Sequence, residues 1–522
     1  MKSATAEFSA QDTSQAHAGE LRHLAWVVGS MAAIFLLSYA LPFLTRFRPL
    51  LADEGLPIVR MFKGSQESEL PGFAEAGLIT RAGVSEQQLA KTLGAHVASN
   101  LGEARDTPPQ DARDVRGAAG QGPDATGPSS GPALRIAPEE YADIPRSIEF
   151  AQNLRPFFTA LERSAMDKPG AITRIAHYGD SAVAADAIAS TARRRFQKRF
   201  GDAGHGFILI SRGNMHYAHK DVLHRTSKGW SAESAVQKSI GEAWYGYGGV
   251  QLRGRAGESA LIGTVKEGPI GTRVSRFELF YQRHKRGGHL QVKIDGEARE
   301  PIDTRADTRE DAFERYDLPD GPHTLSLRAV GGGESRLYGV VLERDEPGVV
   351  YDSLGLVGGR AQRLLNLKAA HIKRQIAHRD PDLLVLGFGG NESANSWLNM
   401  ERYEQELVQV VKHMRAGKPK MACLLFAPLD QGEHDKRGKV VTVETLPQIV
   451  EVQRRVAKRL GCAFFDTFTA MGGEGSMARW RKSRPRLATS DLRHATPEGY
   501  EVIGNLYYKA MLEAFATHLK SR

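Results

Sequence analysis

Three short motifs in this chain contain the residue types of an acyl-transfer site. In chain order they are Gly179-Asp180-Ser181, Gly389-Gly390-Asn391-Glu392 and Asp491-Leu492-Arg493-His494. A serine hydroxyl attacks a carbonyl carbon when an imidazole takes its proton and a carboxylate orients that imidazole. The motifs therefore predict Ser181 as nucleophile, His494 as its base and Asp491 as the carboxylate that orients His494.

Each of these residues also has a structural interpretation. A serine that follows an aspartate is a common helix N-cap, and Asp491 and His494 could cap a final helix. Two glycines followed by Asn391 also favour a simple turn. The chain has 17 histidines, so a single Asp-x-x-His pattern is weak alone. The order of the three motifs and the elements around them favour the catalytic interpretation.

The segments around the motifs alternate between apolar strands and amphipathic helices. Strands are expected at 172–177, 383–388, 421–427 and 463–468, and helices at 150–161, 182–200, 403–414, 446–460 and 497–515. This alternation predicts a parallel sheet with helices on both faces. Ser181 would then lie at the carboxyl edge of the sheet, where open α/β sheets place ligands. The Ser181 N–H and the Asn391 amide could stabilise an oxyanion there.

Between residues 206 and 350 the apolar residues repeat every second position. The clearest runs are Phe277-Leu279-Tyr281, Leu290-Val292-Ile294 and Leu325-Leu327. Such strands, separated by Gly, Asp and Pro turns, predict an antiparallel β-sandwich inserted into the α/β pattern. Trp244 and Tyr247 within this insertion could stack on sugar rings or pack in its core.

These motifs give the chain a resemblance to the SGNH, or GDSL-type, serine hydrolases. In that family a Gly-Asp-Ser block supplies the serine, a late Asp-x-x-His block supplies the other two triad residues, and a glycine and an asparagine complete the oxyanion hole. The resemblance implies a three-layer, flavodoxin-like α/β sheet and no metal or other cofactor. It assigns roles to Ser181, Asn391, Asp491 and His494.

The glycine block of that family resembles the segment from Tyr351 to Gly359. We identify Gly358 as the oxyanion glycine, with Gly355 as the alternative. A β-sandwich inserted between the serine and glycine blocks resembles the peptidoglycan O-acetylesterases, whose insert is like a carbohydrate-binding module. The resemblance covers roughly residues 145–205 and 346–517, with 206–350 as the insertion.

The N-terminal part has a different composition. Residues 24–44 contain no charged residue and could span a bilayer as a helix. A cleaved signal peptide is the alternative, but the polar leader is long for one. We expect a leader at 1–23, a transmembrane anchor at 24–45 and a linker at 46–135, followed by hydrolase segments at 136–205 and 351–522. The catalytic part is expected outside the inner membrane, although the flanking charges favour neither orientation.

Charge and cysteine content add little to the functional prediction. The net charge is +9, with short basic clusters at 193–195 and 481–486, and no nucleic-acid motif accompanies them. Solvated helix faces are the favoured interpretation of these clusters over attraction to an anionic polymer. Cys423 and Cys462 lie in apolar runs, so small buried hydrophobes are expected instead of a disulfide scaffold or a zinc site.

The sequence thus predicts a membrane-anchored serine esterase that removes O-acetyl groups from an envelope polysaccharide such as peptidoglycan. Acyl transfer to a polymer and lipase or thioesterase activity would use the same Ser-His-Asp site and remain alternatives. A non-catalytic glycan-binding membrane protein is the alternative from another class, and the intact motifs argue against it. No nucleic-acid partner is expected.

Overall fold

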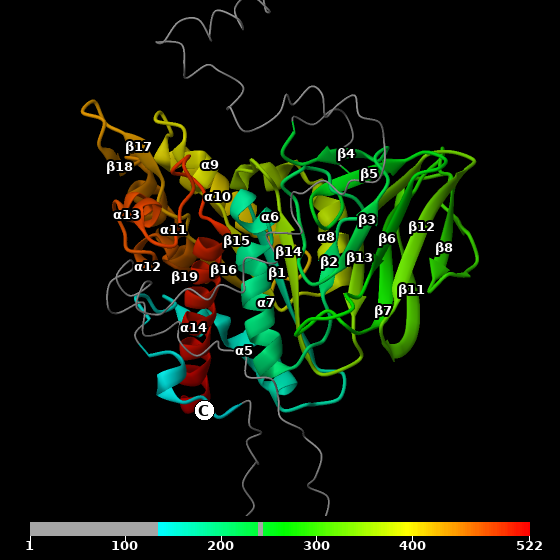
Figure 1. The fold of residues 1–522 in the computed structure, drawn as a ribbon, viewed down its shortest axis with the longest axis horizontal. Coiled ribbons are helices and arrows are strands. Elements are labelled where there is room, and N and C mark those ends of the chain that lie inside the picture. Colours follow the sequence, from blue (N-terminus) through cyan, green and yellow to red (C-terminus); the bar gives the residue numbers. More distant parts are fainter. Residues whose placement is uncertain (1–133, 143, 238–243) are drawn as a thin grey trace, which may run out of the picture. The chain divides into compact units, whose positions relative to one another are not determined.

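The computed structural model describes residues 134–142, 144–237 and 244–522 (Figure 1). The expected leader at 1–23, the expected anchor at 24–45 and almost all of the expected linker lie outside these residues. Within the described ranges no helix is both long and apolar enough to cross a bilayer.

A five-stranded parallel sheet forms the centre of the hydrolase part. Its strands are β1 (Ile172–Gly179), β14 (Gly348–Gly355), β15 (Leu383–Gly387), β16 (Ala422–Phe426) and β19 (Ala463–Phe465). They lie in the order β14-β1-β15-β16-β19, and every neighbouring pair is parallel. Numbered along the chain this is the order 2-1-3-4-5 of flavodoxin-like sheets, whose ligands bind where β1 meets the third strand.

Helices cover both faces of this sheet and make three layers. Successive residues of a strand pack into different hydrophobic clusters, one on each face of the sheet. In β15, for example, Leu384 belongs to one cluster and Val385 to the other. One cluster includes residues of α5 (Arg155–Ala165), α7 (Ala187–Phe200) and α14 (Pro497–Lys520), and the other includes residues of α8 (Ala369–Arg379), α10 (Met400–Arg415) and α11 (Thr445–Leu460). The predicted parallel α/β sheet is therefore confirmed.

Short elements connect these layers. They are η5 (Pro138–Glu140), η6 (Ala151–Leu154), α6 (Ser181–Ala184), η7 (Ala361–Asn366), α9 (Gly390–Ser393), β17 (Gly432–His434), β18 (Val440–Thr442), α12 (Thr467–Ala470) and α13 (Ser476–Lys482). Strands β17 and β18 form an antiparallel hairpin.

The insertion consists of two antiparallel sheets. One has the order β10-β8-β12-β6-β3 with β9 on β8, and the other has the order β11-β7-β13-β5-β4 with β2 on β13. The strands are β2 (Gly206–Ile208), β3 (Leu223–Thr226), β4 (Ser231–Ser234), β5 (Val250–Gly254), β6 (Ser259–Gly263), β7 (Val274–Arg283), β8 (His289–Ile294), β9 (Glu297–Ala298), β10 (Ile302–Asp303), β11 (Glu310–Gly321), β12 (Thr324–Gly331) and β13 (Ser335–Glu343). Both sheets bury their apolar residues in one core, which continues into one side of the hydrolase part. Residues 348–350, expected in the insertion, belong to β14 of the parallel sheet.

The expected helix at 182–200 is interrupted. Helix α6 is a single turn, and Asp186 adopts a left-handed conformation with φ 57° before α7 begins. The buried Asp186 carboxylate accepts hydrogen bonds from Arg193 and from the N–H of Lys220. The solvated face expected for the 193–195 cluster is wrong at Arg193, because this side chain is fully buried against Asp186.

The two cysteines are joined in a disulfide, contrary to the expectation of two separate hydrophobes. Cys423 lies in β16 and Cys462 immediately precedes β19. These strands are neighbours, and their register pairs Leu424 with Ala463, so the two cysteines face each other one residue earlier. Their Cα atoms are 4.8 Å apart, although the residues are separated by 39 positions in sequence.

A buried ion-pair network joins the insertion to the parallel sheet. Arg379 at the end of α8 donates to Asp352 of β14 through Nε and Nη2, both at 2.9 Å. Its Nη1 donates to Glu343 of β13 at 2.5 Å. Arg174 of β1 and Arg276 of β7 also bond Glu343. Burial alone would raise the pKa of Glu343, but these arginines outweigh it and hold the pKa well below its usual range.

We predict that Arg379→Met lowers the free energy of unfolding by about 3–5 kcal/mol, because it leaves two buried carboxylates without their shared cation. Urea unfolding followed by circular dichroism measures this change. Arg402→Met is the matched control, since the Arg402 side chain is 77% exposed and pairs with Glu406 one turn further along α10. This control should change stability by no more than about 0.5 kcal/mol. Equal losses in the two variants would contradict the role of Arg379.

Candidate active site

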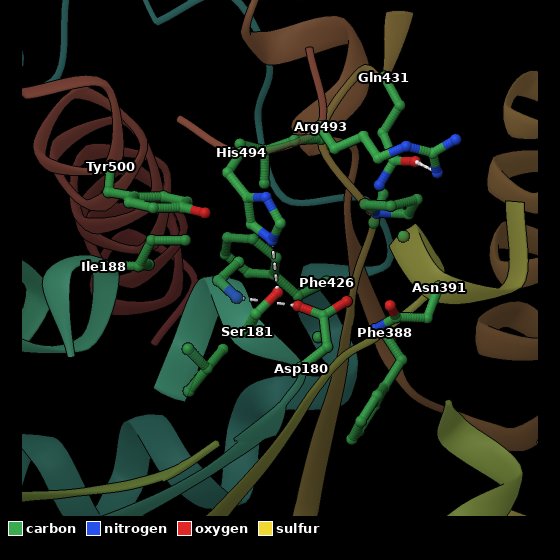
Figure 2. A pocket seen from close by; sticks show the side chains of 17 residues that line it. Asp180, Ser181, Ile188, Phe388, Asn391, Phe426, Gln431, Arg493, His494 and Tyr500 are labelled. Atoms are coloured by element: carbon green, nitrogen blue, oxygen red, sulfur yellow. Dashed lines mark hydrogen bonds between the residues drawn. The ribbon is translucent and has the colours of Figure 1, made fainter. Parts of the chain in front are cut away.

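The three residues of the predicted triad meet at the carboxyl edge of the sheet, and Figure 2 shows Ser181 and His494 in contact there. The Ser181 Oγ atom lies 2.9 Å from His494 Nε2, and His494 Nδ1 lies 2.6 Å from Asp491 Oδ2. This is the arrangement in which an imidazole takes the serine proton while a carboxylate stabilises the imidazolium. Residues separated by more than 300 positions are therefore in direct contact.

The loop that carries Asp491 and His494 is held by its own hydrogen bonds. Asp491 Oδ1 accepts from the Thr489 hydroxyl at 2.5 Å and from the backbone N–H groups of Arg493 and His494. Partial burial would raise the pKa of Asp491, but these bonds and the one from the imidazole outweigh it and hold the pKa well below its ordinary value. Asp491 therefore stays ionised beside His494 at neutral pH.

Leu492 anchors this loop between the two triad residues. It adopts a left-handed conformation with φ 59°, which is costly for a side chain of its size and persists only where packing enforces it. Its side chain is buried at 6% exposure, and its carbonyl accepts from the N–H of Gly432 at 2.8 Å. The catalytic loop is thus attached to the start of the β17–β18 hairpin.

Two buried carboxyl groups lie near the nucleophile: Asp180 precedes Ser181, and Glu392 is close enough to interact with Asp180. Burial raises the pKa of Asp180 to about 6, although the Ala182 N–H and His494 act in the opposite direction. Burial also raises the pKa of Glu392 to about 7, against a hydrogen bond from the Ala361 N–H and with the nearby Asp180 adding to the rise. Asp180 therefore gains its negative charge as the pH passes about 6.

Asn391 lies in the pocket beside Ser181, on the opposite side from Tyr500 in Figure 2. Its Nδ2 donates to the carbonyl of Gly359 at 2.8 Å. A carboxamide nitrogen carries two hydrogens, so this bond orients the group and leaves one donor for an oxyanion. The N–H of Ser181, the first residue of α6, is free of the helix hydrogen-bond pattern and provides a second donor.

Neither candidate glycine lines the pocket that contains Ser181. Gly358 occupies a left-handed turn with φ 72°, and a Cβ there would meet no atom within 4 Å. Gly355 has another role, because its Cβ would lie 2.1 Å from the backbone nitrogen of Ala184. Its missing side chain lets α6 pack against the end of β14. The role of Gly358 as an oxyanion donor stays a prediction, whereas Gly355 positions the turn that carries Ser181.

The two aromatics expected to hold sugar lie outside this pocket. Tyr247 is 0% exposed, its hydroxyl donates to Asp352, and its ring contacts Tyr178 and Phe207, so the prediction that it binds substrate is wrong. Trp244 is half-buried against His371, with Lys368 5.0 Å from its ring centroid. The core-packing alternative thus holds for Tyr247, and sugar contact at Trp244 stays a prediction.

The walls of the pocket include residues that sequence reasoning missed. Phe388, Phe426 and Leu429 are apolar, and Gln431 and Arg493 are polar. Arg493 is exposed, and its Nη1 lies 3.4 Å from Gln431 Oε1. The position of Arg493 between two triad residues was the available signal. In the described part of the chain, no group of three or more His, Cys, Asp or Glu residues is placed to hold a metal ion.

Another missed residue is Trp397, which is 91% exposed. It lies in the loop between α9, which carries Asn391, and α10. Its backbone N–H is bonded to the side chain of Asn395, which shapes the loop beneath it. An unpacked indole so close in sequence to the pocket offers an apolar platform at the carboxyl edge.

The sheet order and the Ser-His-Asp contacts define a serine ester hydrolase of the SGNH type. Residues 321–502 match the model of the GDSL-like Lipase/Acylhydrolase family. The matched range contains Asn391, Asp491 and His494 but not Ser181, because the insertion separates the serine motif from the rest. Among curated proteins no sequence match was found.

Solved structures resemble the chain to different degrees. A peptidoglycan O-acetylesterase superposes with a TM-score of 0.57 at 21% identity, covering 72% of this chain and 97% of that chain. A family two carbohydrate esterase from Clostridium thermocellum has a TM-score of 0.23 at 10% identity, covering 57% of this chain and 99% of that chain. A GDSL-like lipase from Bacteroides thetaiotaomicron VPI-5482 has a TM-score of 0.24 at 20% identity, covering 31% of this chain and 76% of that chain. Only the first likeness bears on the fold.

We predict that Asn391→Ala lowers kcat by roughly 10²–10³, the usual effect of losing one oxyanion donor, with a smaller change in KM. Steady-state kinetics on a small acetyl ester measures both constants. Asn399→Ala is the matched control, because the Asn399 side chain only caps α10 by accepting from the Arg402 N–H. That variant should lose about 1 kcal/mol of stability and keep its kcat. If Asn391→Ala instead melts early with an unchanged kcat, Asn391 is a turn residue.

Proposed function

We propose that this protein removes O-acetyl groups from an acetylated polysaccharide of the cell envelope, with peptidoglycan as the leading substrate. The observation that carries this proposal is the small size of the cavity at the nucleophile. Its volume is about 60 Å³, and apolar side chains such as Val183, Ile188 and Phe426 surround it. A site that holds a water molecule needs at least about 10–15 Å³ on this measure, so there is room for a few non-hydrogen atoms. An acetyl group fits this space and a fatty acyl chain does not.

The reaction follows from the contacts at the site. Ser181 Oγ attacks the ester carbonyl carbon and passes its proton to His494 Nε2, while Asp491 stabilises the imidazolium. The oxyanion is held by the Ser181 N–H and the Asn391 amide. When the C–O bond to the sugar breaks, His494 returns the proton to the departing sugar oxygen. Water, activated by His494, then attacks the acetyl-enzyme and releases acetate and free Ser181.

The position of the site supports a polymeric substrate. The triad lies at an exposed edge, and the side chains of Asp491 and His494 are 48% and 44% exposed. A long glycan can therefore lie across the edge while one acetyl group enters the cavity. Trp397 is suited to stack on a sugar ring beside it, since apolar sugar faces pack on aromatic rings. One solved structure that shares the fold is a peptidoglycan O-acetylesterase.

An extracytoplasmic location is part of the proposal. The disulfide between Cys423 and Cys462 is of the kind that persists in oxidising compartments and is rare in the cytosol. The uncharged stretch at 24–44 would anchor the protein to the inner membrane and leave the hydrolase part in the periplasm. Lipase activity is disfavoured by the small cavity. Acyl transfer is separated from hydrolysis by measuring whether acetate or an acetylated acceptor forms.

We predict that acetyl esters are the preferred substrates, and that kcat/KM falls by about tenfold or more from acetyl to octanoyl esters of one alcohol, because the extra methylene groups do not fit the cavity. The protein should also release acetate from O-acetylated peptidoglycan. Ser181→Ala should release none above background while keeping the wild-type melting curve. Equal rates on short and long acyl chains would contradict the proposed acetyl specificity.

We predict that Trp397→Ala impairs hydrolysis of acetylated polymer by roughly tenfold and leaves a small acetyl ester unaffected, because only the polymer extends far enough to stack on the indole. The ratio of kcat/KM on the two substrates measures the effect. Trp397→Phe should recover most of the polymer activity, since it restores an aromatic face. The prediction is wrong if Trp397→Ala has the same kcat/KM as the wild type on both substrates.

A further inference from the structure

A second cleft opens beside the catalytic loop. It lies between the β17–β18 hairpin and α13. Half of its lining residues are polar or charged, namely Lys439, Thr442, Glu474, Arg479, Arg481 and Lys482, and the others are glycines and apolar residues. Lys439 comes from the hairpin, and the other three cations come from α13. Both walls therefore carry positive charge, and Glu474 is the one carboxylate among the lining residues.

The four cations of this cleft have no carboxylate partner among the described residues. Within the described residues, no carboxylate pairs with Lys439, Arg481 or Lys482 in the hydrogen bonds and ion pairs of the structure. Arg479 donates only to the carbonyls of Gly472 and Glu474. Other surface arginines are paired with carboxylates; Arg455, for example, lies 2.9 Å from Glu404. Unpaired cations that face each other across a cleft attract anions from solution.

The cleft is continuous with the catalytic loop. Leu492 forms part of its wall, while the next two residues, Arg493 and His494, line the catalytic pocket. The bond from the Gly432 N–H to the Leu492 carbonyl joins the hairpin wall to that loop. Arg493 is exposed, and it follows Leu492 of the basic cleft and precedes the catalytic His494. A chain that reaches Ser181 can extend across Arg493 into the cleft.

We propose that this basic cleft binds a carboxylate-bearing part of the acetylated polymer while its acetyl ester lies at Ser181. This inference rests on the proposed function and names its substrate class, an acidic glycan or glycopeptide. Guanidinium and ammonium groups bind carboxylates through charge-assisted hydrogen bonds. The cleft therefore selects acetylated polymers that carry a carboxylate near the ester over neutral ones. The basic segment at 481–486 supplies two of its four cations.

The test uses the Arg481→Glu/Lys482→Glu double variant of the full chain. We expect kcat/KM on O-acetylated peptidoglycan, which carries carboxylates, to fall by roughly tenfold, because two attractions become repulsions. Activity on a neutral acetylated glycan and on a small acetyl ester should not change. Lys198→Glu is the matched control, since Lys198 is an exposed cation at the end of α7 that lines neither cleft. It should behave as the wild type on all three substrates.

Binding without turnover separates this inference from the proposed function. Ser181→Ala should bind de-acetylated acidic glycan more weakly as salt rises, and adding the double substitution should remove most of this salt dependence. If the wild type hydrolyses only the small ester, the proposed function fails, while retained binding of acidic glycan still supports the cleft. The inference is overturned if the double variant hydrolyses and binds the acidic polymer normally. It is also overturned if the cleft binds a phosphate-bearing polymer and ignores carboxylates.

Discussion

The structure depends on the guanidinium of Arg379, which lies between the buried carboxylates of Asp352 and Glu343. Asp352 belongs to the edge strand of the parallel sheet and Glu343 to the last strand of the insertion, so one cation connects both parts. The same Asp352 accepts from the Tyr247 hydroxyl and from the N–H of Phe207. These bonds fix the position of β14. Its end at Gly355 then supports the helical turn that begins with Ser181. Charge pairing far from the chemistry therefore positions the nucleophile.

The catalytic base, His494, is held in position by a different part of the structure. The loop with His494 depends on the left-handed Leu492, whose backbone and side chain are held by the β17–β18 hairpin and the core. The nucleophile is thus positioned by the first half of the sheet and the base by the last loop. They meet where the strand order changes direction, the place at which open α/β sheets leave room for a ligand.

The sequence predicted those features that local pattern determines. The apolar strands, the amphipathic helices and the period-two insertion are visible in short windows, and the three motifs indicate the triad. Features that depend on distant partners were missed. Cys423 and Cys462 pair only because β16 and β19 are neighbours. Tyr247 looks like a sugar platform until the buried Asp352 that receives its hydroxyl is known. The break at Asp186 likewise depends on Arg193 and the Lys220 N–H.

The insertion contributes to function in a different way from the one that its resemblance implies. Its aromatic Tyr247 is committed to the core, and that core is continuous with one side of the hydrolase part. A module packed in this way holds β14 and cannot reorient to follow a glycan. Apart from the half-buried Trp244, the exposed groups suited to polymer contact lie on loops of the hydrolase part, with Trp397 after the asparagine motif and Arg493 within the histidine motif. Substrate choice in this protein is therefore expected to vary with those loops, while the insertion keeps the nucleophile in place.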